Sequence, residues 1–486
     1  MKKIAILFLC VVFTGCSDFL DENPKGAVVG TNALNSVEGL DAALTGAYKG
    51  MLRTWARGVL TSAIVGFAMG GDDLTTLTGG NKASFRQLDQ FNVTSSNDRL
   101  VQIWSGCYKT IQGSNNIINN YENVPGDRAV INVIAGEAYF LRGLCYYWLV
   151  RGWGEIPLMT VSDFTFDMLS VEKSSPAEVY ALIESDLKMA EQLLPVAKRD
   201  PGRSNIGAAK ALLADVYLTE GGWPIKDPSK YALAAAKAKE VIDNKTAYGF
   251  DLVPDLATLW SGTSTAAGTK EEVFAFQTSI KYGGSTNSFY GFPAQPGDEG
   301  GWDDYMAEIG FFNRFPAGKR KDLTFYTIFT KPDGTKVNWE NGQSKHPYFR
   351  KFMLTPNDNF NSSQPVHIIR YAHVLLIYAE AQARSTGSPN VDAYAGVNAI
   401  RERAGLTPLA GLTNGDFVNA VVDERAWEFA AEWCRWFDLQ RLELVEAANA
   451  PAMKDANDLL SIGNITKSDY WYPIPIGDAN MNKDLD

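Results

Sequence analysis

Acidic residues gather around one tryptophan near position 300, and their types and spacing could do chemistry. They are Asp298, Glu299, Asp303 and Asp304, on either side of Trp302. Two carboxyl groups that flank a glycosidic bond can hydrolyse it, one as general acid and the other as nucleophile or base. Neighbouring carboxylates in a single loop are more often solvated charges, and sequence does not give the separation that hydrolysis requires. We therefore do not expect an enzyme.

The aromatic residues of the same region favour binding instead. Residues 281–304 are rich in Gly, Ser and Pro, yet they include Tyr282, Tyr290 and Trp302. A flat ring stacks on the apolar face of a pyranose, and neighbouring Asp, Asn or Arg side chains bond the sugar hydroxyls. Ordinary packing of the loop onto the rest of the protein is the alternative for each ring. The pattern is consistent with a sugar-binding loop that needs no nucleophile.

Residues for other reaction chemistry are sparse. The three histidines are His346, His367 and His373, and none is paired at a helical metal-ligand spacing. The chain contains no Gly-x-Ser-x-Gly elbow, no Gly-x-Gly-x-x-Gly turn and no Gly-x4-Gly-Lys phosphate loop. We expect no metal ion, no cofactor and no catalytic residue.

The N-terminus carries the features of a bacterial lipoprotein signal. Two lysines precede an apolar run at residues 4–13, which is too short to span a bilayer. Small residues lead directly to Cys16, whose thiol can carry diacylglycerol once the signal is removed. The residues that follow Cys16 are acidic, as in an anchored, surface-displayed protein. The alternative interpretation of the N-terminus is a plain secretory signal without lipidation. We predict a signal peptide at residues 1–15, lipidation of Cys16, and an acylated leader at residues 16–30.

Composition limits the partners, membrane attachments and disulfide bonds that the protein can have. The chain has 486 residues and a net charge of −11, with the basic residues spread among the acids. A nucleic-acid surface would need clustered Lys and Arg, so we expect no nucleic-acid partner. The lipid on Cys16 is the expected membrane attachment, because no other segment is long and apolar enough to cross a bilayer. Beyond it, Cys107, Cys145 and Cys434 form an odd set, which indicates buried free thiols rather than a disulfide framework.

Most of the chain is predicted to be helical, because apolar residues recur at spacings of three and four in Ala-rich stretches. Small residues on one helix face let a partner approach closely, as a tetratricopeptide unit requires. Four such pairs can be drawn: 40–51 with 99–121, 130–151 with 176–194, 208–220 with 231–244, and 366–385 with 392–404. The full repeat signature is missing from each pair. The predicted fold is mainly α, with four tetratricopeptide-like helix pairs.

Two long insertions interrupt the pairs. One covers residues 70–97, and a longer irregular one contains a predicted β-hairpin at 325–339 that turns at Asp333-Gly334. Segments of this length in a compact protein are usually functional or form a subdomain. The predicted division is three helical units at 31–248, a ligand-binding insertion at 249–364, and the fourth pair with a helical C-terminal region at 365–486.

Several blocks of sequence follow one another in a specific order. They are the start Cys16-Ser-Asp-Phe-Leu-Asp-Glu-Asn-Pro24, then Ala135-Gly-Glu-Ala-Tyr-Phe-Leu-Arg142 with Gly154-Glu-Ile-Pro-Leu158, Arg370-Tyr-Ala-His-Val-Leu-Leu-Ile-Tyr-Ala-Glu-Ala381, Val397-Asn-Ala-Ile-Arg-Glu-Arg-Ala-Gly405, and Glu424-Arg-Ala-Trp-Glu-Phe-Ala-Ala-Glu-Trp-Cys-Arg-Trp-Phe-Asp-Leu439. Together they resemble the SusD/RagB outer-membrane lipoproteins of Bacteroidetes over nearly the whole chain. His373 stands where the family commonly has Asp, and the closing Tyr472-Pro-Ile-Pro-Ile476 lacks the usual Glu. Neither departure changes the expected fold.

The resemblance implies binding without turnover. Family members capture glycans or other nutrients at the cell surface and pass them to a TonB-dependent, SusC-like transporter, over which they lie as a lid. Ligand contacts come mainly from variable insertions, here residues 70–97 and 281–304. The candidate ligand-binding residues are Asp73, Asn81, Arg86, Tyr282, Tyr290 and Trp302. The charged residues of the recurring blocks are expected to form helix-to-helix ion pairs instead: Arg142, Glu380, Arg401, Glu424, Arg425 and Asp438.

Two other functions stay open from sequence. One is a surface-anchored glycoside hydrolase that uses the acids near Trp302. The other is a helical-repeat scaffold that binds a protein or a non-sugar nutrient. In each case the expected location is the outer membrane, through a lipid anchor, facing the exterior.

Overall fold

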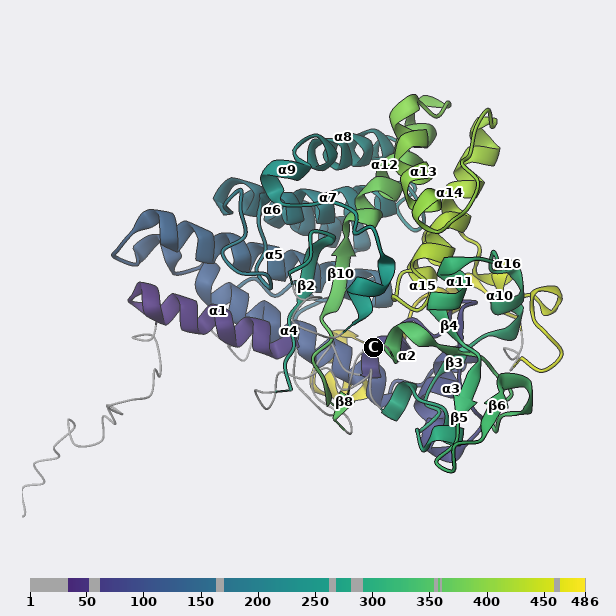
Figure 1. Cartoon of the computed structure of the whole chain (residues 1–486). Helices are drawn as coiled ribbons and strands as arrows, with labels where there is room; N and C mark the ends of the chain where they lie inside the picture. The colour runs from purple at the N-terminus through teal and green to yellow at the C-terminus, as the bar shows by residue number, and fades with distance from the viewer. Residues whose placement is uncertain are drawn as a thin grey trace, which may run out of the picture.

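The computed structural model describes residues 34–51, 62–162, 170–261, 268–280, 292–353, 357–358, 361–458 and 464–485. Long helices fill its N-terminal half and pack side by side (Figure 1). The long and short helices of this half are α1 (Val37–Met51), α2 (Ser62–Phe67), α3 (Ala83–Asp89), α4 (Asp98–Ile118), α5 (Arg128–Trp153), α6 (Pro176–Leu193), α7 (Ile206–Glu220), α8 (Lys230–Asp243) and α9 (Lys245–Tyr248). Within the described ranges, no helix is both long and apolar enough to cross a membrane.

The helix starts follow from local sequence. The side chain of Asp127 accepts a hydrogen bond from the backbone N–H of Ala129 at 2.8 Å, which caps the 26-residue α5. Ser175 and Glu178 form a reciprocal capping box at the start of α6, and Pro176 occupies the first turn, where a backbone N–H is not needed. Because α1, α4 and α6 pack around α5, most side chains of this helix are buried. It forms the centre of the main hydrophobic core.

The four predicted helix pairs are in contact: α1 with α4, α5 with α6, α7 with α8, and α12 (Tyr371–Thr386) with α13 (Val391–Arg403). The mainly α fold is thereby confirmed. The tetratricopeptide geometry of the pairs and the division into domains stay predictions.

The predicted start of the fourth pair is wrong, because Val366–Arg370 forms the strand β10 rather than a helix. This strand pairs antiparallel with β2 (Glu272–Phe276), so that Val366 lies opposite Phe276. Its β-branched residues suit a buried strand. The segment becomes a strand because it pairs with β2, which is far away in sequence. Helix α12 begins only at Tyr371.

The long insertion forms short strands and helices, most of which lie beside the C-terminal helices on the right in Figure 1, whereas β2 and β8 lie nearer the centre. The two-stranded sheets are β1 (Leu74–Thr75) with β3 (Met306–Ala307), β4 (Phe325–Tyr326) with β7 (Tyr348–Phe349), β5 (Ile328–Thr330) with β6 (Lys336–Asn338), and β8 (Asn357–Asp358) with β9 (Asn361–Ser362). The remaining helices are α10 (Ile309–Arg314), α11 (Lys319–Thr324), α14 (Asn414–Glu428), α15 (Arg435–Arg441), α16 (Val445–Ala448) and α17 (Ile476–Met481). The predicted hairpin is confirmed as β5 and β6, where Gly334 adopts the positive φ that its turn requires.

A buried ion-pair network ties the insertion to the C-terminal helices. Arg370 is 0% exposed, and its guanidinium lies 2.5 Å from Glu271, 3.0 Å from Glu428 and 2.8 Å from Glu432. The predicted helix-to-helix ion pairs are confirmed: Arg142–Asp186, Arg441–Glu380, Arg401–Glu424 and Arg425–Asp438. Buried charges must be paired, since an isolated one would be costly to desolvate. The recurring sequence blocks therefore hold the fold together.

Candidate ligand-binding site

The two insertions meet in space although they are separated by about 220 residues of sequence. Strand β1 from the first pairs antiparallel with β3 from the second, with Leu74 opposite Ala307. Beside this pair the hydroxyl of Thr76 donates to the backbone carbonyl of Asp304 at 2.7 Å. We call this contact region, residues 74–86 with 292–307, the insertion junction.

Lys82 is the central residue of the insertion junction. Its side chain is only 4% exposed, and its ammonium forms an ion pair with the carboxylate of Asp304. The same ammonium donates to the backbone carbonyl of Trp302 at 2.6 Å. A charged lysine can be buried here because both contacts replace its water. Lys82 thereby fixes the backbone of the Trp302 loop against the first insertion.

The loop around Trp302 is held tightly by its own backbone. The backbone N–H of Trp302 donates to the carbonyl of Phe292 at 2.8 Å, and that of Asp304 donates to Pro293 at 3.0 Å. A Cβ at Gly301 would lie 2.2 Å from the carbonyl oxygen of Gln295, so only glycine fits there. The indole of Trp302 stays 37% exposed and stacks beside the ring of Phe292, with 6.4 Å between ring centroids. A rigid loop thus presents a partly exposed aromatic ring.

The predicted ligand-binding residues take different positions. Asn81 is exposed and belongs to the same junction as Trp302. Arg86 is half-buried and donates to the backbone carbonyl of Thr76 and, at 3.0 Å, to Asp89. Tyr282 and Tyr290 lie outside the described residues.

Asp73 faces inward. It is 2% exposed, and its carboxylate accepts the backbone N–H of Ala431 at 2.8 Å. Burial raises the pKa of this carboxyl to about 6. Asn81 and Trp302 are therefore the predicted residues of the insertion junction that are exposed.

The four acidic residues around Trp302 are committed to structural hydrogen bonds. Asp298 accepts from the backbone of Gln343 at 2.7 Å, and Glu299 accepts from the hydroxyl of Tyr326 at 2.6 Å. Asp303 accepts from the backbone N–H of Gly297 at 2.5 Å and from the hydroxyl of Tyr348. Asp304 pairs with Lys82. These bonds shape the loop that carries Trp302.

Sequence reasoning missed Lys82. Lys82 follows a Gly-Gly-Asn stretch and has no nearby acid that would mark it as buried. Its partners lie in the other insertion, and that contact is a property of the fold. Phe292 belongs to the aromatic run of residues 281–304 that is apparent in the sequence, and the structure adds its stacking against Trp302.

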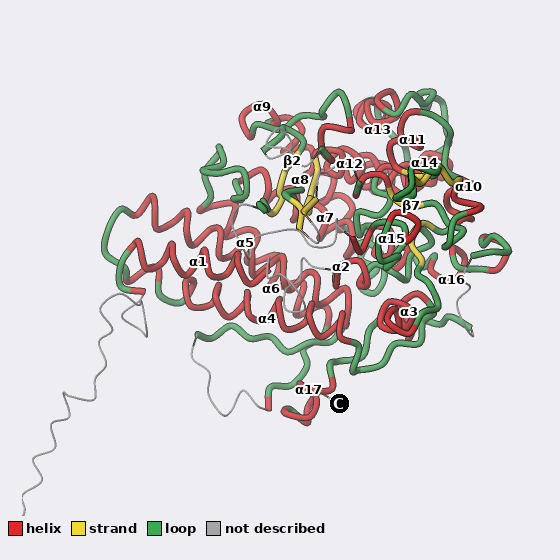
Figure 2. The backbone as a smooth tube through the Cα atoms, turned by 60° about the horizontal axis from the view of Figure 1, so that its bottom comes forward, coloured by secondary structure: helices red, strands yellow, loops and turns green. Residues whose placement is uncertain are grey.

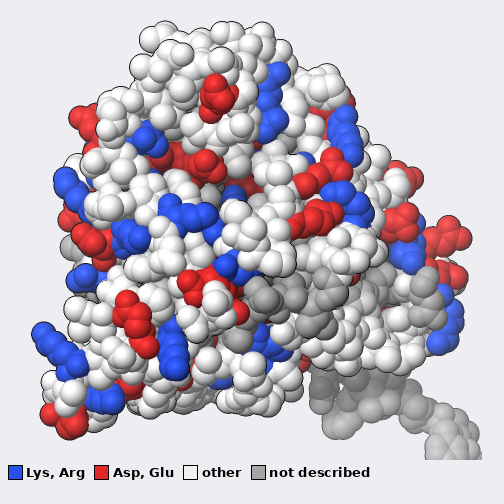
Figure 3. All heavy atoms as spheres, turned by 90° about the vertical axis from the view of Figure 1, so that its right-hand side faces the viewer, with Lys and Arg blue, Asp and Glu red and all other residues white. Residues whose placement is uncertain are grey.

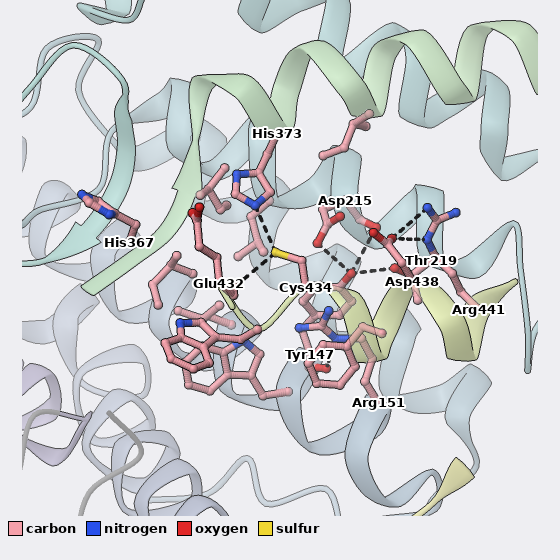
Figure 4. A pocket seen from close by; sticks show the side chains of 18 of the residues that line it. Tyr147, Arg151, Asp215, Thr219, His367, His373, Glu432, Cys434, Asp438 and Arg441 are labelled. Atoms are coloured by element: carbon pink, nitrogen blue, oxygen red, sulfur yellow. Dashed lines mark hydrogen bonds and ion pairs between the residues drawn. The ribbon is translucent and has the colours of Figure 1, made fainter. Parts of the chain in front are cut away.

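A small cavity of about 70 Å³ lies among α5, α7, α12 and α15 (Figure 4). The hydroxyl of Tyr147 donates to Asp215 at 2.9 Å, and His373 lies 3.2 Å from the sulfur of Cys434. Burial lowers the pKa of His373 and raises that of the Cys434 thiol, so the two form a neutral pair and not a reactive thiolate. A cavity of this size holds a few waters, whereas small-ligand pockets span about 300 to 1,000 Å³.

The charges on the visible surface are mixed. On the side of the molecule where α10, α16 and β6 lie, acidic and basic side chains are interspersed (Figure 3). Among the described residues, no group of three or more His, Cys, Asp or Glu is placed to hold a metal ion. This face therefore shows no continuous patch of positive or of negative charge that would bind a highly charged ligand.

Known proteins share both sequence and fold with this chain. A SusD-like protein P2 from Formosa agariphila is 30% identical over all of this chain and 99% of its own length. The chain belongs to the SusD/RagB family. The SusD family model matches residues 276–486, and a second model, described as starch-binding associating with outer membrane, matches residues 18–218.

Solved structures of the SusD superfamily agree with the fold. A protein from Parabacteroides distasonis superposes with a TM-score of 0.80 at 25% identity, covering 92% of this chain and 98% of that protein. A laminarin-binding SusD-like protein superposes with a TM-score of 0.76 at 23% identity, covering 92% of this chain and 98% of its own. In this SusD/RagB chain, the insertion junction is thus built on a fold that the family shares.

Proposed function

We propose that this SusD/RagB protein is an outer-membrane lipoprotein, anchored through Cys16 and facing the exterior, that binds oligo- or polysaccharides. It delivers them to a TonB-dependent, SusC-like transporter. The observation that carries the binding part is the insertion junction, which presents the partly exposed ring of Trp302 on a loop fixed by backbone hydrogen bonds and also contains the exposed Asn81. Family membership and the starch-binding description of the matched model support the same ligand class.

The geometry of the junction suits a sugar. The partly exposed indole offers a flat apolar face on which a pyranose ring can stack, and Asn81 supplies an amide that can bond sugar hydroxyls as donor and acceptor. The four carboxylates around the ring are bound to structural partners, which favours a structural role for them over a role as an acid and base pair. Capture rather than cleavage is therefore the proposed activity. Tyr282 and Tyr290 are proposed as further stacking residues, Asp73 and Arg86 as supports of the junction.

A glycan panel tests the binding part. The purified protein is incubated with starch, laminarin, xyloglucan and their oligosaccharides, and binding and product formation are measured together. Saturable binding without product is expected. Depletion of a glycan into shorter products would establish a hydrolase instead, and neither binding nor product from any glycan would favour a scaffold or a non-sugar nutrient.

A pulldown tests the delivery part. The tagged lipoprotein is isolated from its own outer membrane in mild detergent, and we expect a TonB-dependent barrel to be recovered with it. The unlipidated soluble domain, added to solubilised membranes, serves as a control for non-specific capture. Repeated isolation without a barrel would argue against the transporter partnership.

A further inference from the structure

A cluster of buried charges adjoins the strand pair of the insertion junction. It combines three carboxylates with two cations, and we call it the acid cluster: Asp89, Glu308, Asp458, Arg86 and Lys454. Its members come from helix α3, from the turn between β3 and α10, and from the segment 451–458 that follows α16. Helices α3, α10 and α16 lie at the same end of the molecule, on the right in Figures 1 and 2.

Two carboxylates of the acid cluster are attached to the two strands of the junction. Asp89 accepts a hydrogen bond from the hydroxyl of Thr75 in β1 at 3.0 Å and another from Arg86 at 3.0 Å. Glu308 directly follows β3 and forms an ion pair with Lys454, whose side chain is 3% exposed. Because β1 pairs with β3, Asp89 and Glu308 act on opposite strands of one small sheet.

The third carboxylate fastens the C-terminal segment to the same place. Asp458 accepts from the backbone N–H of Ile309 and, at 2.8 Å, from that of Gly310. The ring of His346 lies 3.8 Å from Asp458, and its Nδ1 lies 2.7 Å from the backbone carbonyl of Ser344. Burial lowers the pKa of His346, so the ring is neutral near pH 7 and adds no positive charge.

The charges of the acid cluster do not balance when all its carboxyls are ionised. Three carboxylates then stand against two cations, Arg86 and Lys454. Asp72 also lies within electrostatic range of Lys454, but it has its own cations, Arg435 at 2.5 Å and Arg314 at 3.2 Å. Buried carboxylates that share a counterion repel each other, and one of them takes up a proton more readily.

The proton belongs to Asp89 and Glu308. The Oε2 atom of Glu308 is buried without a hydrogen-bond partner among the described residues, which is costly for a charged carboxylate. Burial raises the pKa of Glu308 well above its ordinary value, and the charges of Asp89 and Asp458 raise it further against the effect of Lys454. Burial also raises the pKa of Asp89 to about 6, although Lys454 and Arg86 oppose it.

We propose that the acid cluster is a proton-operated latch of the insertion junction. With one proton shared between Asp89 and Glu308, the two cations neutralise the two remaining charges and the strands stay joined. Loss of that proton leaves an excess negative charge where β1 and β3 meet, which loosens the junction.

The latch also bears on the ligand, a consequence that rests on the proposed function. The loop of Trp302 is held to the first insertion by Lys82 and by the bond from Thr76 to Asp304. Loosening the β1–β3 pair therefore disturbs the position of the ring. A group whose folded-state pKa is raised stabilises the fold in its protonated form, and this contribution is lost as the pH rises through that pKa. Glycan affinity should accordingly be higher in mildly acidic than in alkaline solution.

Hydrogen exchange tests the latch without a ligand. Protection of the backbone N–H groups of residues 306–310 is measured by mass spectrometry in the full-length mature protein at pH 6 and pH 8, corrected for the intrinsic pH dependence of exchange. Glu308→Gln keeps the shape of the side chain and is neutral at both pH values. Asp89→Asn removes the excess charge from the other strand. Glu340→Gln, at an exposed position of the same insertion, is the matched control.

We expect protection in the wild type and in Glu340→Gln to be roughly tenfold higher at pH 6 than at pH 8, in line with the loss of one proton. Glu308→Gln and Asp89→Asn should each show the same protection at both pH values. Equal protection of the wild type at the two pH values would overturn the latch. The wild-type pH dependence retained in both Glu308→Gln and Asp89→Asn would overturn it as well.

Calorimetric titration with laminari-, xylogluco- and malto-oligosaccharides at the same two pH values tests the effect on binding. The wild type should bind its glycan about threefold to tenfold more tightly at pH 6, whereas Glu308→Gln should bind equally at both. An affinity that does not change with pH, beside protection that does, would overturn the coupling to the ligand. If protection changes with pH and no oligosaccharide binds, the proposed function falls and the latch stands.

Discussion

Trp302 combines a fixed backbone with an available ring. Its carbonyl is held by Lys82 and its N–H by Phe292, whereas 37% of the residue is exposed. Trp302→Ala should therefore leave the loop in place and remove the stacking face. We expect the affinity for the glycan to fall by about 1 to 3 kcal/mol, the scale of a lost aromatic contact, with little change in melting temperature. Calorimetric titration and thermal unfolding of the same sample measure both quantities.

The control for this substitution is Ile328→Ala, which truncates an exposed apolar residue on the neighbouring β5. It should change neither affinity nor stability appreciably. If Trp302→Ala costs about 3 to 5 kcal/mol of stability while the intrinsic affinity is kept, the ring is a packing residue and not a platform.

For single residues, the sequence predicts the exposure of Trp302 better than the burial of Asp73. Glycines and acids around a tryptophan indicate a loop that presents its ring, because those residue types form turns and prefer water. Asp73 has the same polar appearance, yet its carboxylate is buried against Ala431, 358 residues further along the chain. No local pattern could reveal that contact.

The insertion junction is the element on which binding depends, and Lys82 holds it together. Lys82→Met removes the ammonium and leaves the buried carboxylate of Asp304 without its partner. We expect both stability and glycan affinity to fall, the former by about 3 to 5 kcal/mol, the usual cost of breaking a buried ion pair. This joint loss distinguishes Lys82 from Trp302, whose truncation affects affinity alone.

Lys49→Met, on the exposed side of α1, is the matched control and should be close to neutral. Thermal unfolding and calorimetry again give the two readouts. Wild-type affinity in a folded Lys82→Met protein would show that the junction does not position the ligand-binding residues.

Arg370 holds the long insertion to the C-terminal helices, as Lys82 holds the insertion junction together. It contacts three glutamates with no solvent exposure, so Arg370→Leu leaves buried carboxylates uncompensated. We expect a loss of about 3 to 5 kcal/mol in the free energy of unfolding, measured in urea. Arg384→Leu, on the helix α12 that follows Arg370, is the control, because Arg384 is 25% exposed and its partner Glu380 keeps Arg441. Equal destabilisation by the two substitutions would contradict the special role of Arg370.

Most helices and the β-hairpin could be predicted from the sequence, but the long-range contacts between elements could not. Helices such as α5 and the β5–β6 hairpin follow from periodicity and turn residues, which are local signals. The strand β10 was missed because its partner β2 is about 90 residues away. The pairing of β1 with β3 is longer in range still, so the insertion junction could be expected only as two separate loops.

For the whole molecule, the proposed anchor decides where the fold is displayed. Cys16→Ser removes the thiol that accepts the lipid. We expect the variant to appear in soluble or uncleaved form, since no other attachment is proposed. Cell fractionation and immunoblotting measure the distribution, with Ser17→Ala as the control that keeps the thiol. A Cys16→Ser protein found in the outer membrane at the wild-type level would refute the lipid anchor.

The buried ion-pair network also sets how the whole fold responds to acid. Burial by itself raises the pKa of Glu432, but Arg370 and Lys351 lower it to about 2. Arg425 and Arg441 lower the pKa of Asp438 to about 2, and Arg441 does the same for Glu380. A folded-state pKa below the unfolded value means that the stability is present above about pH 4.5 and is lost as the pH falls toward 2. Each group contributes on the order of 2 to 3 kcal/mol.

We therefore expect the free energy of unfolding to fall steeply between pH 4.5 and 2, as measured by urea titration at each pH. Asp73 acts in the opposite direction, because its pKa is about 6 in the folded state and its protonation therefore favours folding as the pH falls from about 6 to about 4. Well below its unfolded pKa it is protonated in both states and adds no slope. Glu432→Gln should be less stable at pH 7, since Arg370 and Lys351 lose a charged partner. Its acid slope should be shallower by about one proton, because one titrating carboxyl is gone. Parallel slopes in the wild type and Glu432→Gln would show that this carboxylate does not report the network.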